Sequence, residues 1–181
     1  MTKCQTVTSV LLFDTCGAVA DSLTPIEVHI PCSYINNNTS RNYNYDYALI
    51  TVEENLQNYK QFNLALSQDD LGDTNSSVSV TGFPQKVNGN IVNSLTVHNK
   101  YNGNGNVTEL DEYVIRYAAY TTSGNSGSPV YITENYNGEM YYSVIAIHSR
   151  GFEQNGLNNV YGTRITTDIL KFYRSNPFAL Y

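Results

Sequence analysis

The chain has 181 residues, enough for one domain with a substantial hydrophobic core. Charged residues make up only 14% of it, and the net charge of -6 comes without any lysine or arginine cluster that could neutralise a phosphate backbone or an anionic membrane surface. No apolar run reaches the roughly 20 residues of a membrane span. Because Tyr, Thr, Ser, Val and Ile are abundant, we expect an all-β protein that binds neither nucleic acid nor a membrane.

The first predicted strand runs from Val7 to Phe13. The same apolar stretch, followed by the small residues Ala18-Val19-Ala20, also imitates a signal peptide. Asp14 and Cys16 interrupt that pattern, so a strand that ends at a turn is the favoured interpretation.

The chain has three cysteines, Cys4, Cys16 and Cys32, all near its start. An odd number leaves at least one of them without an internal disulfide partner. Their spacing includes no CxxC or Cys/His pattern suited to zinc. We therefore expect no metal site, and nothing in the sequence calls for an organic cofactor.

Further along the chain, short apolar or alternating runs recur between turn signals, which is typical of a sandwich or barrel. The later predicted strands are Ile26 to Ile30, Tyr47 to Val52, Ser77 to Thr81, Asn90 to His98, Tyr113 to Tyr117, Pro129 to Thr133, Tyr141 to Ile147 and Val160 to Arg164. The predicted turns, which use the positive φ that Asn and Gly tolerate, are Asn88-Gly89, Asn102 to Asn106, Asn137-Gly138 and Asn155-Gly156. One helix is predicted, from Thr166 to Arg174, and without a linker or repeat we expect residues 1–181 to form one domain.

The strongest chemical signal is the segment from Thr121 to Val130, TTSGNSGSPV. Glycines on both sides of Ser126 allow a turn in which backbone N–H groups face the oxyanion that forms when a serine attacks a carbonyl. The segment is not the G-x-S-x-G elbow of α/β-hydrolases, because Ser128 takes the second glycine position and Pro129 forbids the helix that should follow. A Ser/Gly-rich loop between strands is commonly only a connection, so the residue types alone leave both interpretations open.

The segment Gly124 to Val130 resembles the nucleophile loop of the glutamyl endopeptidases and related trypsin-like serine proteases. Three other segments are similar to family motifs and occur in the family's order. Tyr45 to Ile50 resembles the strand with the orienting aspartate, Val80 to Pro84 the central "TGYP" segment, and Val144 to Ser149 the strand beside the specificity pocket. The resemblance covers the chain from about Val7 onward.

The resemblance implies a chymotrypsin-like double antiparallel β-barrel, with the first barrel incomplete, and a C-terminal helix. It also implies that Ser126 is the nucleophile and that Asp46 holds a catalytic histidine in the required tautomer. The backbone N–H groups of Gly124 and Ser126 would form the oxyanion hole. We expect a monomer that acts on peptide or protein substrates and is exported, as such proteases usually are.

The same resemblance places His148, Thr121 and Ser149 at a pocket for the side chain that precedes the cleaved bond. A histidine and a hydroxyl can both bind a carboxylate, so the resemblance implies cleavage after Glu, and less readily after Asp. By residue type alone, a histidine that ends an apolar strand is more often structural. Arg150 departs from the small residues usual at this pocket, where it would either strengthen acid recognition or block the pocket.

The family's catalytic histidine lies in an "AAHC"-like segment upstream of the aspartate, and this chain has no such segment. His29 reads as a surface histidine of an alternating strand, and His98 has no catalytic counterpart in the family. We therefore expect a shortened family member that lacks the histidine segment and is inactive or nearly so. A pseudoprotease that binds acidic peptides is the alternative. An aspartic peptidase, prompted by Leu11 to Gly17, is disfavoured because Cys16 interrupts Asp-Thr-Gly and no second copy exists.

Overall fold

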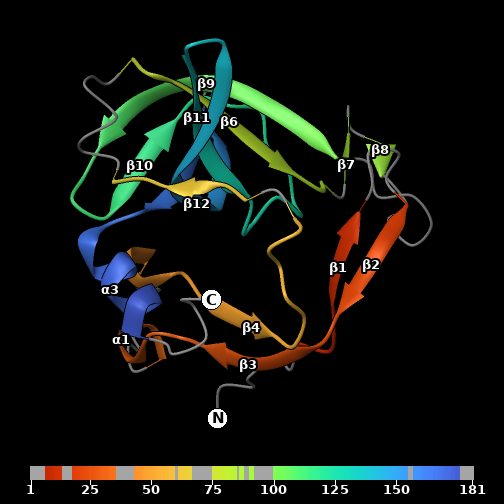
Figure 1. Cartoon of the computed structure of the whole chain (residues 1–181). Coiled ribbons are helices and arrows are strands. Elements are labelled where there is room, and N and C mark those ends of the chain that lie inside the picture. The colour runs from red at the N-terminus through yellow and green to blue at the C-terminus, as the bar shows by residue number, and fades with distance from the viewer. Residues whose placement is uncertain are drawn as a thin grey trace.

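The computed structural model describes residues 7–13, 18–35, 43–59, 61–66, 75–84, 86–87, 90–91, 100–154 and 157–175. In the second half of the chain, six antiparallel strands form a closed barrel (Figure 1). These strands are β6 (Ser77–Gly82), β9 (Tyr101–Leu110), β10 (Val114–Tyr117), β11 (Pro129–Tyr136), β12 (Glu139–Gln154) and β13 (Leu157–Arg164). Their order is β11-β6-β9-β10-β13-β12, and the pairing of β11 with β12 closes the ring.

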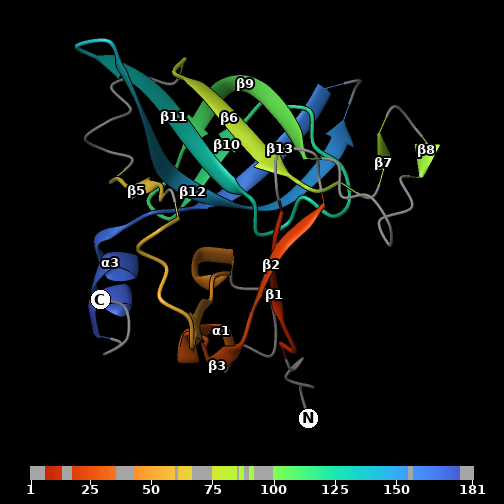
Figure 2. The same ribbon diagram turned by 45° about the vertical axis from the view of Figure 1, so that its right-hand side comes forward.

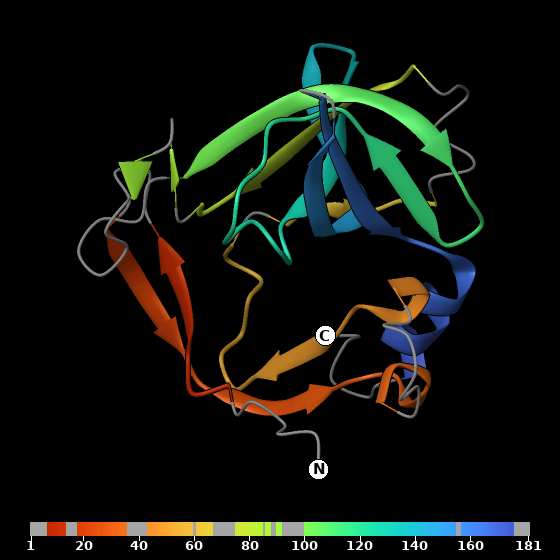
Figure 3. The same ribbon diagram turned by 180° about the vertical axis from the view of Figure 1, so that it is seen from behind.

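The described chain before β6 forms two separate two-stranded sheets instead of a second closed barrel (Figure 3). Its short strand β5 (Asn63–Leu64) instead pairs with β12 of the barrel. One hairpin joins β1 (Val10–Phe13) to β2 (Val19–Leu23), and an antiparallel pair joins β3 (Pro25–His29) to β4 (Leu49–Val52). The short elements are α1 (Cys32–Ile35), the 3-10 turn η1 (Tyr43–Tyr45), β5 (Asn63–Leu64), β7 (Lys86–Val87) and β8 (Asn90–Ile91). The predicted fold class, a chymotrypsin-like protein with an incomplete first barrel, is confirmed.

The barrel interior is the main hydrophobic core of the protein. In β6, buried residues alternate with more exposed ones, as expected for a strand with one face inward. The fully or almost fully buried members of the core are Val78, Val80, Val107, Ile115, Tyr117, Ala119, Val130, Ile132, Ile145, Ala146 and Val160. Residues from all six barrel strands therefore meet in one cluster, which gives the loops on the barrel rim a rigid support.

The helix α3 (Thr167–Ser175) packs below the barrel (Figure 2). Its buried Ile169 joins a second core cluster with Tyr131, Val144 and Ile165. The ring of Phe172 meets that of Tyr47 edge-on, with the centroids 5.3 Å apart, so the helix also contacts the segment that precedes β4. Among the described residues, no helix is long and apolar enough to cross a membrane.

The prediction of a turn from Asn102 to Asn106 is wrong, because these residues lie in the middle of the ten-residue strand β9. Close packing explains why this strand contains glycine. A Cβ atom on Gly103 would lie 2.2 Å from the backbone oxygen of Tyr120, and one on Gly105 would lie 1.8 Å from that of Ala118. The glycines therefore allow the segment that follows β10 to cross β9 at close range. The asparagine between them, Asn104, accepts a hydrogen bond from Ser79 on the neighbouring strand β6.

Several other predictions can be compared with the observed elements. The turn at Asn137-Gly138 is confirmed, with positive φ at both residues. The predicted single helix corresponds to α3, but α1, a single turn after Pro31, was missed, as were the strands β2, β5, β7 and β9. The turns at Asn88-Gly89 and Asn155-Gly156, and the predicted strand beyond Ile91, lie outside the described residues, as do Cys4 and Cys16.

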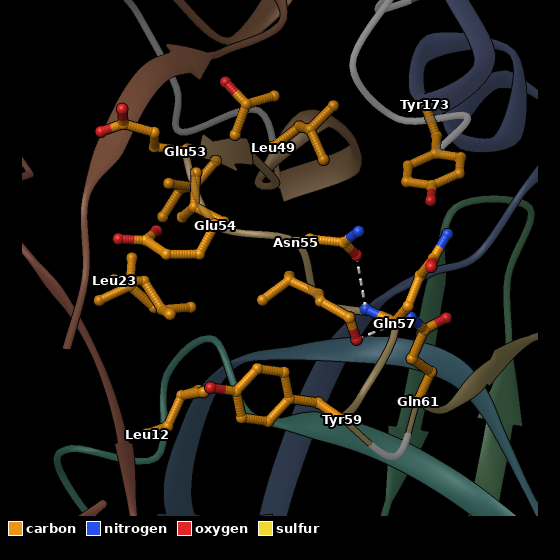
Figure 4. A pocket seen from close by; sticks show the side chains of 15 residues that line it. Leu12, Leu23, Leu49, Glu53, Glu54, Asn55, Gln57, Tyr59, Gln61 and Tyr173 are labelled. Atoms are coloured by element: carbon orange, nitrogen blue, oxygen red, sulfur yellow. Dashed lines mark hydrogen bonds between the residues drawn. The ribbon is translucent and has the colours of Figure 1, made fainter. Parts of the chain in front are cut away.

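The incomplete half encloses an open hollow of about 690 Å³ (Figure 4). Leu12 and Leu23 line it from the first hairpin, Leu49 from β4, and Tyr173 from α3. Glu53 and Glu54 follow β4 at its edge, and the carboxylate of Glu54 accepts the N–H of Thr24. None of the residues predicted to act in catalysis lines this hollow.

Candidate active site

The nucleophile loop connects β10 to β11 at the rim of the barrel. Its glycines, Gly124 and Gly127, have φ values of 99° and 86°, which residues with a Cβ rarely adopt. Two successive turns result, with the N–H of Asn125 bonded to Thr122 O at 3.1 Å and that of Ser128 bonded to Asn125 O at 3.0 Å. The sequence pattern therefore encodes a tight double turn, as an oxyanion-binding loop requires.

Two hydrogen bonds join this loop to β12. The N–H of Gly127 donates to His148 O at 2.8 Å, and the N–H of His148 donates to Ser128 O at 2.9 Å. Within the loop, the amides of Asn125 and Ser128 donate to loop oxygens, and that of Gly127 donates to β12. The amides of Gly124 and Ser126, which are expected to bind an oxyanion, make no such backbone bond among the described residues.

Ser126 is exposed at the tip of the loop. Its hydroxyl donates to the backbone oxygen of Ser149 at 3.3 Å. A hydroxyl held in this way lies over the same strand that carries His148. No histidine side chain in the described part of the chain is bonded to it.

Ser126 opens onto a pocket of about 440 Å³ between the nucleophile loop and β12. The pocket brings together five of the residues predicted from the sequence, which are Ser126, Thr121, His148, Ser149 and Arg150. Its other lining residues are Tyr120, Thr122, Ser123, Gly151 and Val160. Three Ser and Thr residues of the loop other than Ser126, an imidazole and a guanidinium therefore line one space beside the candidate nucleophile.

His148 is 3% exposed, and its Nδ1 lies 2.5 Å from the hydroxyl of Tyr117. Burial lowers the pKa of His148 to about 4, because the imidazolium would lose its hydration, so the ring is neutral at pH 7. Burial raises the pKa of Tyr117, which keeps its proton. In the tautomer in which Nδ1 accepts from the Tyr117 hydroxyl, the ring carries its proton on Nε2, where it can serve as a hydrogen-bond donor.

Asp46 is placed elsewhere in the molecule. It follows η1, is half-buried, and its N–H donates to Tyr43 O at 3.4 Å. The side chain of Thr163 on β13 also donates to Tyr43 O, at 2.9 Å, so the turn before Asp46 is fixed to the barrel. Asp46 does not line the pocket that contains Ser126.

Neither of the other histidines supplies a base at this site in the described residues. Nε2 of His29 lies 3.0 Å from a carboxylate oxygen of Glu27 on the same strand, β3, which agrees with a histidine on a solvent-facing strand. His98 lies outside the described residues, as does the Asp14 to Gly17 part of the aspartic-peptidase-like segment. Among the described residues, no group of three or more His, Cys, Asp and Glu side chains is placed to hold a metal ion.

Three tyrosines at this site were missed by the sequence reasoning. Tyr117 bonds His148 from inside the core, and Tyr43 and Tyr161 lie against the guanidinium of Arg150. The only signal for Tyr117 was its inward place in the strand pattern, which predicts a core residue equally well. Nothing local marks Tyr43 or Tyr161, because each contact joins segments far apart in the sequence.

A closed six-stranded barrel beside an incomplete one, with a glycine-flanked serine loop at the rim, is the architecture of the chymotrypsin-fold serine proteases. Residues 13–139 match the model of the trypsin-like peptidase domain, and the chain belongs to this family. By family it is a hydrolase, a serine endopeptidase. No curated protein matches the sequence significantly.

Two solved structures have a similar fold. A Glu endopeptidase in complex with MPD superposes with a TM-score of 0.68 at 22% identity, over 92% of this chain and 70% of the other. A thermostable serine protease, AL20, from an extremophilic microorganism superposes with a TM-score of 0.63 at 16% identity, over 86% of this chain and 67% of the other. At these identities the likeness supports the fold, and specificity has to be argued from the site.

Proposed function

We propose that this chain carries the nucleophile, oxyanion hole and specificity pocket of a serine endopeptidase that cleaves after acidic residues. The observation that carries the proposal is that Ser126 and His148 line one pocket. Ser126 Oγ would attack the scissile carbonyl carbon, and the amides of Gly124 and Ser126 would bind the resulting oxyanion, each contributing about 3 kcal/mol of transition-state stabilisation. In a complete site, Asp46 would orient the catalytic histidine that accepts the serine proton. His148 is not that histidine, because it belongs to the specificity pocket.

The chemistry of the pocket supports an acidic side chain as its ligand. The hydroxyl of Thr121 and Nε2–H of His148 are both hydrogen-bond donors, and a carboxylate accepts from several donors at once. An aliphatic side chain would leave these donors without partners, which costs binding energy. Specificity for Glu over Asp is supported by the resemblance to glutamyl endopeptidases.

We further propose that the chain by itself binds acidic peptides but hydrolyses them slowly or not at all. The observation in favour is that the Ser126 hydroxyl donates to a backbone oxygen and not to an imidazole. The imidazole of His148, which lines the same pocket, is bonded to Tyr117 instead. Without a base for its proton, a serine site loses several orders of magnitude in rate. A peptide-binding pseudoprotease is therefore the second candidate. In either case we propose peptide or protein ligands, a monomeric state and, as in the family it resembles, export.

The test is turnover of chromogenic peptides that end in Glu, Gln or Phe before the reporter group, with Ser126→Ala as the blank. We expect no turnover above the blank, and tighter binding of the peptide with Glu. Turnover of the Glu substrate that Ser126→Ala abolishes would establish the protease and refute the inactivity. Equal binding of the three peptides would refute acidic specificity.

A further inference from the structure

Arg150 lies on β12 at a β-bulge, the point where the pairing of β12 with β13 slips. His148 pairs with Gly162 and Arg150 with Tyr161, so Ser149 is the extra residue between them. A bulge changes the direction of the side chains around it, which is why bulges are common beside active sites. Here His148, Ser149 and Arg150 all line the same pocket, although a regular strand would turn the middle one away.

The guanidinium of Arg150 lies against two aromatic rings. Its central carbon lies 3.2 Å from the ring centroid of Tyr43 and 4.8 Å from that of Tyr161. Stacking of this kind fixes the plane of the guanidinium and removes much of its freedom before any ligand arrives. Arg150 therefore presents a pre-oriented cation to the pocket.

This cation has no acidic partner in the described part of the chain. Its Nε is buried and makes no hydrogen bond there, which is also true of Nε in Arg116, so the difference between the two arginines is the counter-ion. Arg116 makes a useful comparison, because it lies 4.8 Å from the centroid of the same Tyr161 ring but pairs with Glu109 at 2.6 Å. A partly buried charge without a counter-ion is costly, and an anionic ligand would supply the missing partner.

We propose that Arg150 is the fixed positive charge of the specificity pocket and forms an ion pair with the carboxylate of the bound acidic side chain, with Thr121 and His148 acting as neutral donors. This inference rests on the acidic specificity proposed above and assigns its electrostatic part to one residue. An arginine is suited to this role because its planar fork can bind both oxygens of a carboxylate.

Among the side chains that the structure describes around Arg150, no other group is charged at pH 7. The titratable groups around it are Tyr43 on η1, Tyr161 on β13, and His148 and Tyr120 in the pocket. Burial keeps the imidazole of His148 neutral at pH 7, so it contributes a dipole instead of a charge. Guanidinium groups stay charged in proteins across the working pH range.

The experiment compares binding of two fluorescein-labelled tetrapeptides, identical except for a C-terminal Glu or Gln, to the full chain by fluorescence polarisation. Both peptides keep the terminal carboxylate, so only the side-chain charge differs. The variants are Arg150→Gln, Arg150→Lys and the matched control Arg116→Gln, which removes the same charge from the same tyrosine ring outside the pocket. Near-UV circular dichroism checks that each variant is folded.

We expect the wild type to prefer the Glu peptide, and Arg150→Gln to lose on the order of tenfold in that preference. Arg116→Gln should keep it, and Arg150→Lys should keep most of it. A full preference in folded Arg150→Gln would overturn the role of Arg150 but leave acidic specificity intact. Equal or absent binding of both peptides by the wild type would overturn both proposals.

A measurement on the wild type alone covers the case in which Arg150→Gln does not fold. Between pH 5.5 and 8 the peptide carboxylates stay ionised, so a pocket charged by arginine should prefer Glu to the same degree throughout. A preference that disappears as the pH rises through about 6.5 would assign the charge to a histidine and refute the inference.

Discussion

The hydroxyl of Tyr117 and Nδ1 of His148 form a 2.5 Å hydrogen bond inside the barrel, where Tyr117 is fully buried and His148 is 3% exposed. The two residues belong to β10 and β12, which are not paired with each other but are separated by β13. The bond fixes the position of an imidazole that lines the pocket beside Ser126. It connects the packing of the core to the chemistry of the site.

Replacing Tyr117 by Phe should destabilise the protein by about 1–3 kcal/mol, because Nδ1 of His148 would be left buried without a donor. Binding of a peptide ending in Glu should weaken several-fold, since the imidazole would lose its fixed orientation. Urea denaturation and fluorescence polarisation measure the two effects. Tyr136→Phe, at a tyrosine that is 68% exposed, is the control and should change neither. Unchanged stability in Tyr117→Phe would contradict the role of the bond.

The burial of His148 predicts a loss of stability on acidification. Its pKa is about 4 in the folded protein and near 6.5 in the unfolded chain, so between these values the unfolded state binds more protons. Stability should therefore fall as the pH drops from 6.5 toward 4, by about 3 kcal/mol in total.

Urea midpoints at pH 7.5, 6.5, 5.5 and 5.0 test this prediction. The carboxylates of Asp21 and Glu54 also have lowered pKa values, through their hydrogen bonds to Tyr59 and Thr24, but they protonate at lower pH. The window above pH 5 therefore isolates histidine. His148→Gln should flatten the slope there, and a slope that persists in this variant would assign the effect to another group.

Gly105 is predicted to be intolerant of a side chain. In Gly105→Ala the new Cβ would lie 1.8 Å from the backbone oxygen of Ala118, so β9 and the crossing chain would have to separate. We expect a loss of more than about 4 kcal/mol or failure to fold, in the range reserved for such clashes. Asn104→Ala next to it removes two exposed hydrogen bonds, those from Ser79 and Asn102, and should cost about 1 kcal/mol. Similar stabilities of the two variants would refute the packing argument.

The stack of Tyr43 on Arg150 links the turn before Asp46 to the pocket. A double-mutant cycle with Tyr43→Leu and Arg150→Gln should give a coupling energy of about 0.5–2 kcal/mol in thermal or urea unfolding. A second cycle combines Tyr161→Leu with Arg150→Gln. Its coupling energy should be smaller, because the Tyr161 ring lies farther from the guanidinium than the Tyr43 ring does. Strictly additive effects in both cycles would show that neither ring stabilises the guanidinium of Arg150.

The predictions that succeeded rest on local patterns. Alternating burial in β6 and the Asn137-Gly138 turn follow from backbone geometry over a few residues, and the structure has both. The prediction at Asn102 to Asn106 failed because the same composition that marks a turn also marks a strand crossed closely by another chain segment. A composition cannot distinguish these cases, since the neighbour that demands glycine lies in a distant part of the sequence.

The sequence by itself determined the class of the protein, the barrel strands other than β9, and the serine loop, because each depends on contiguous residues whose spacing sets the backbone conformation. The tertiary structure decided which of the predicted site residues share a space. It places Ser126, Thr121, His148, Ser149 and Arg150 around one pocket and leaves Asp46 outside it. It also brings Tyr117 to His148 and Tyr43 to Arg150, since only closure of the barrel and docking of η1 on β13 make residues so far apart in the chain into neighbours.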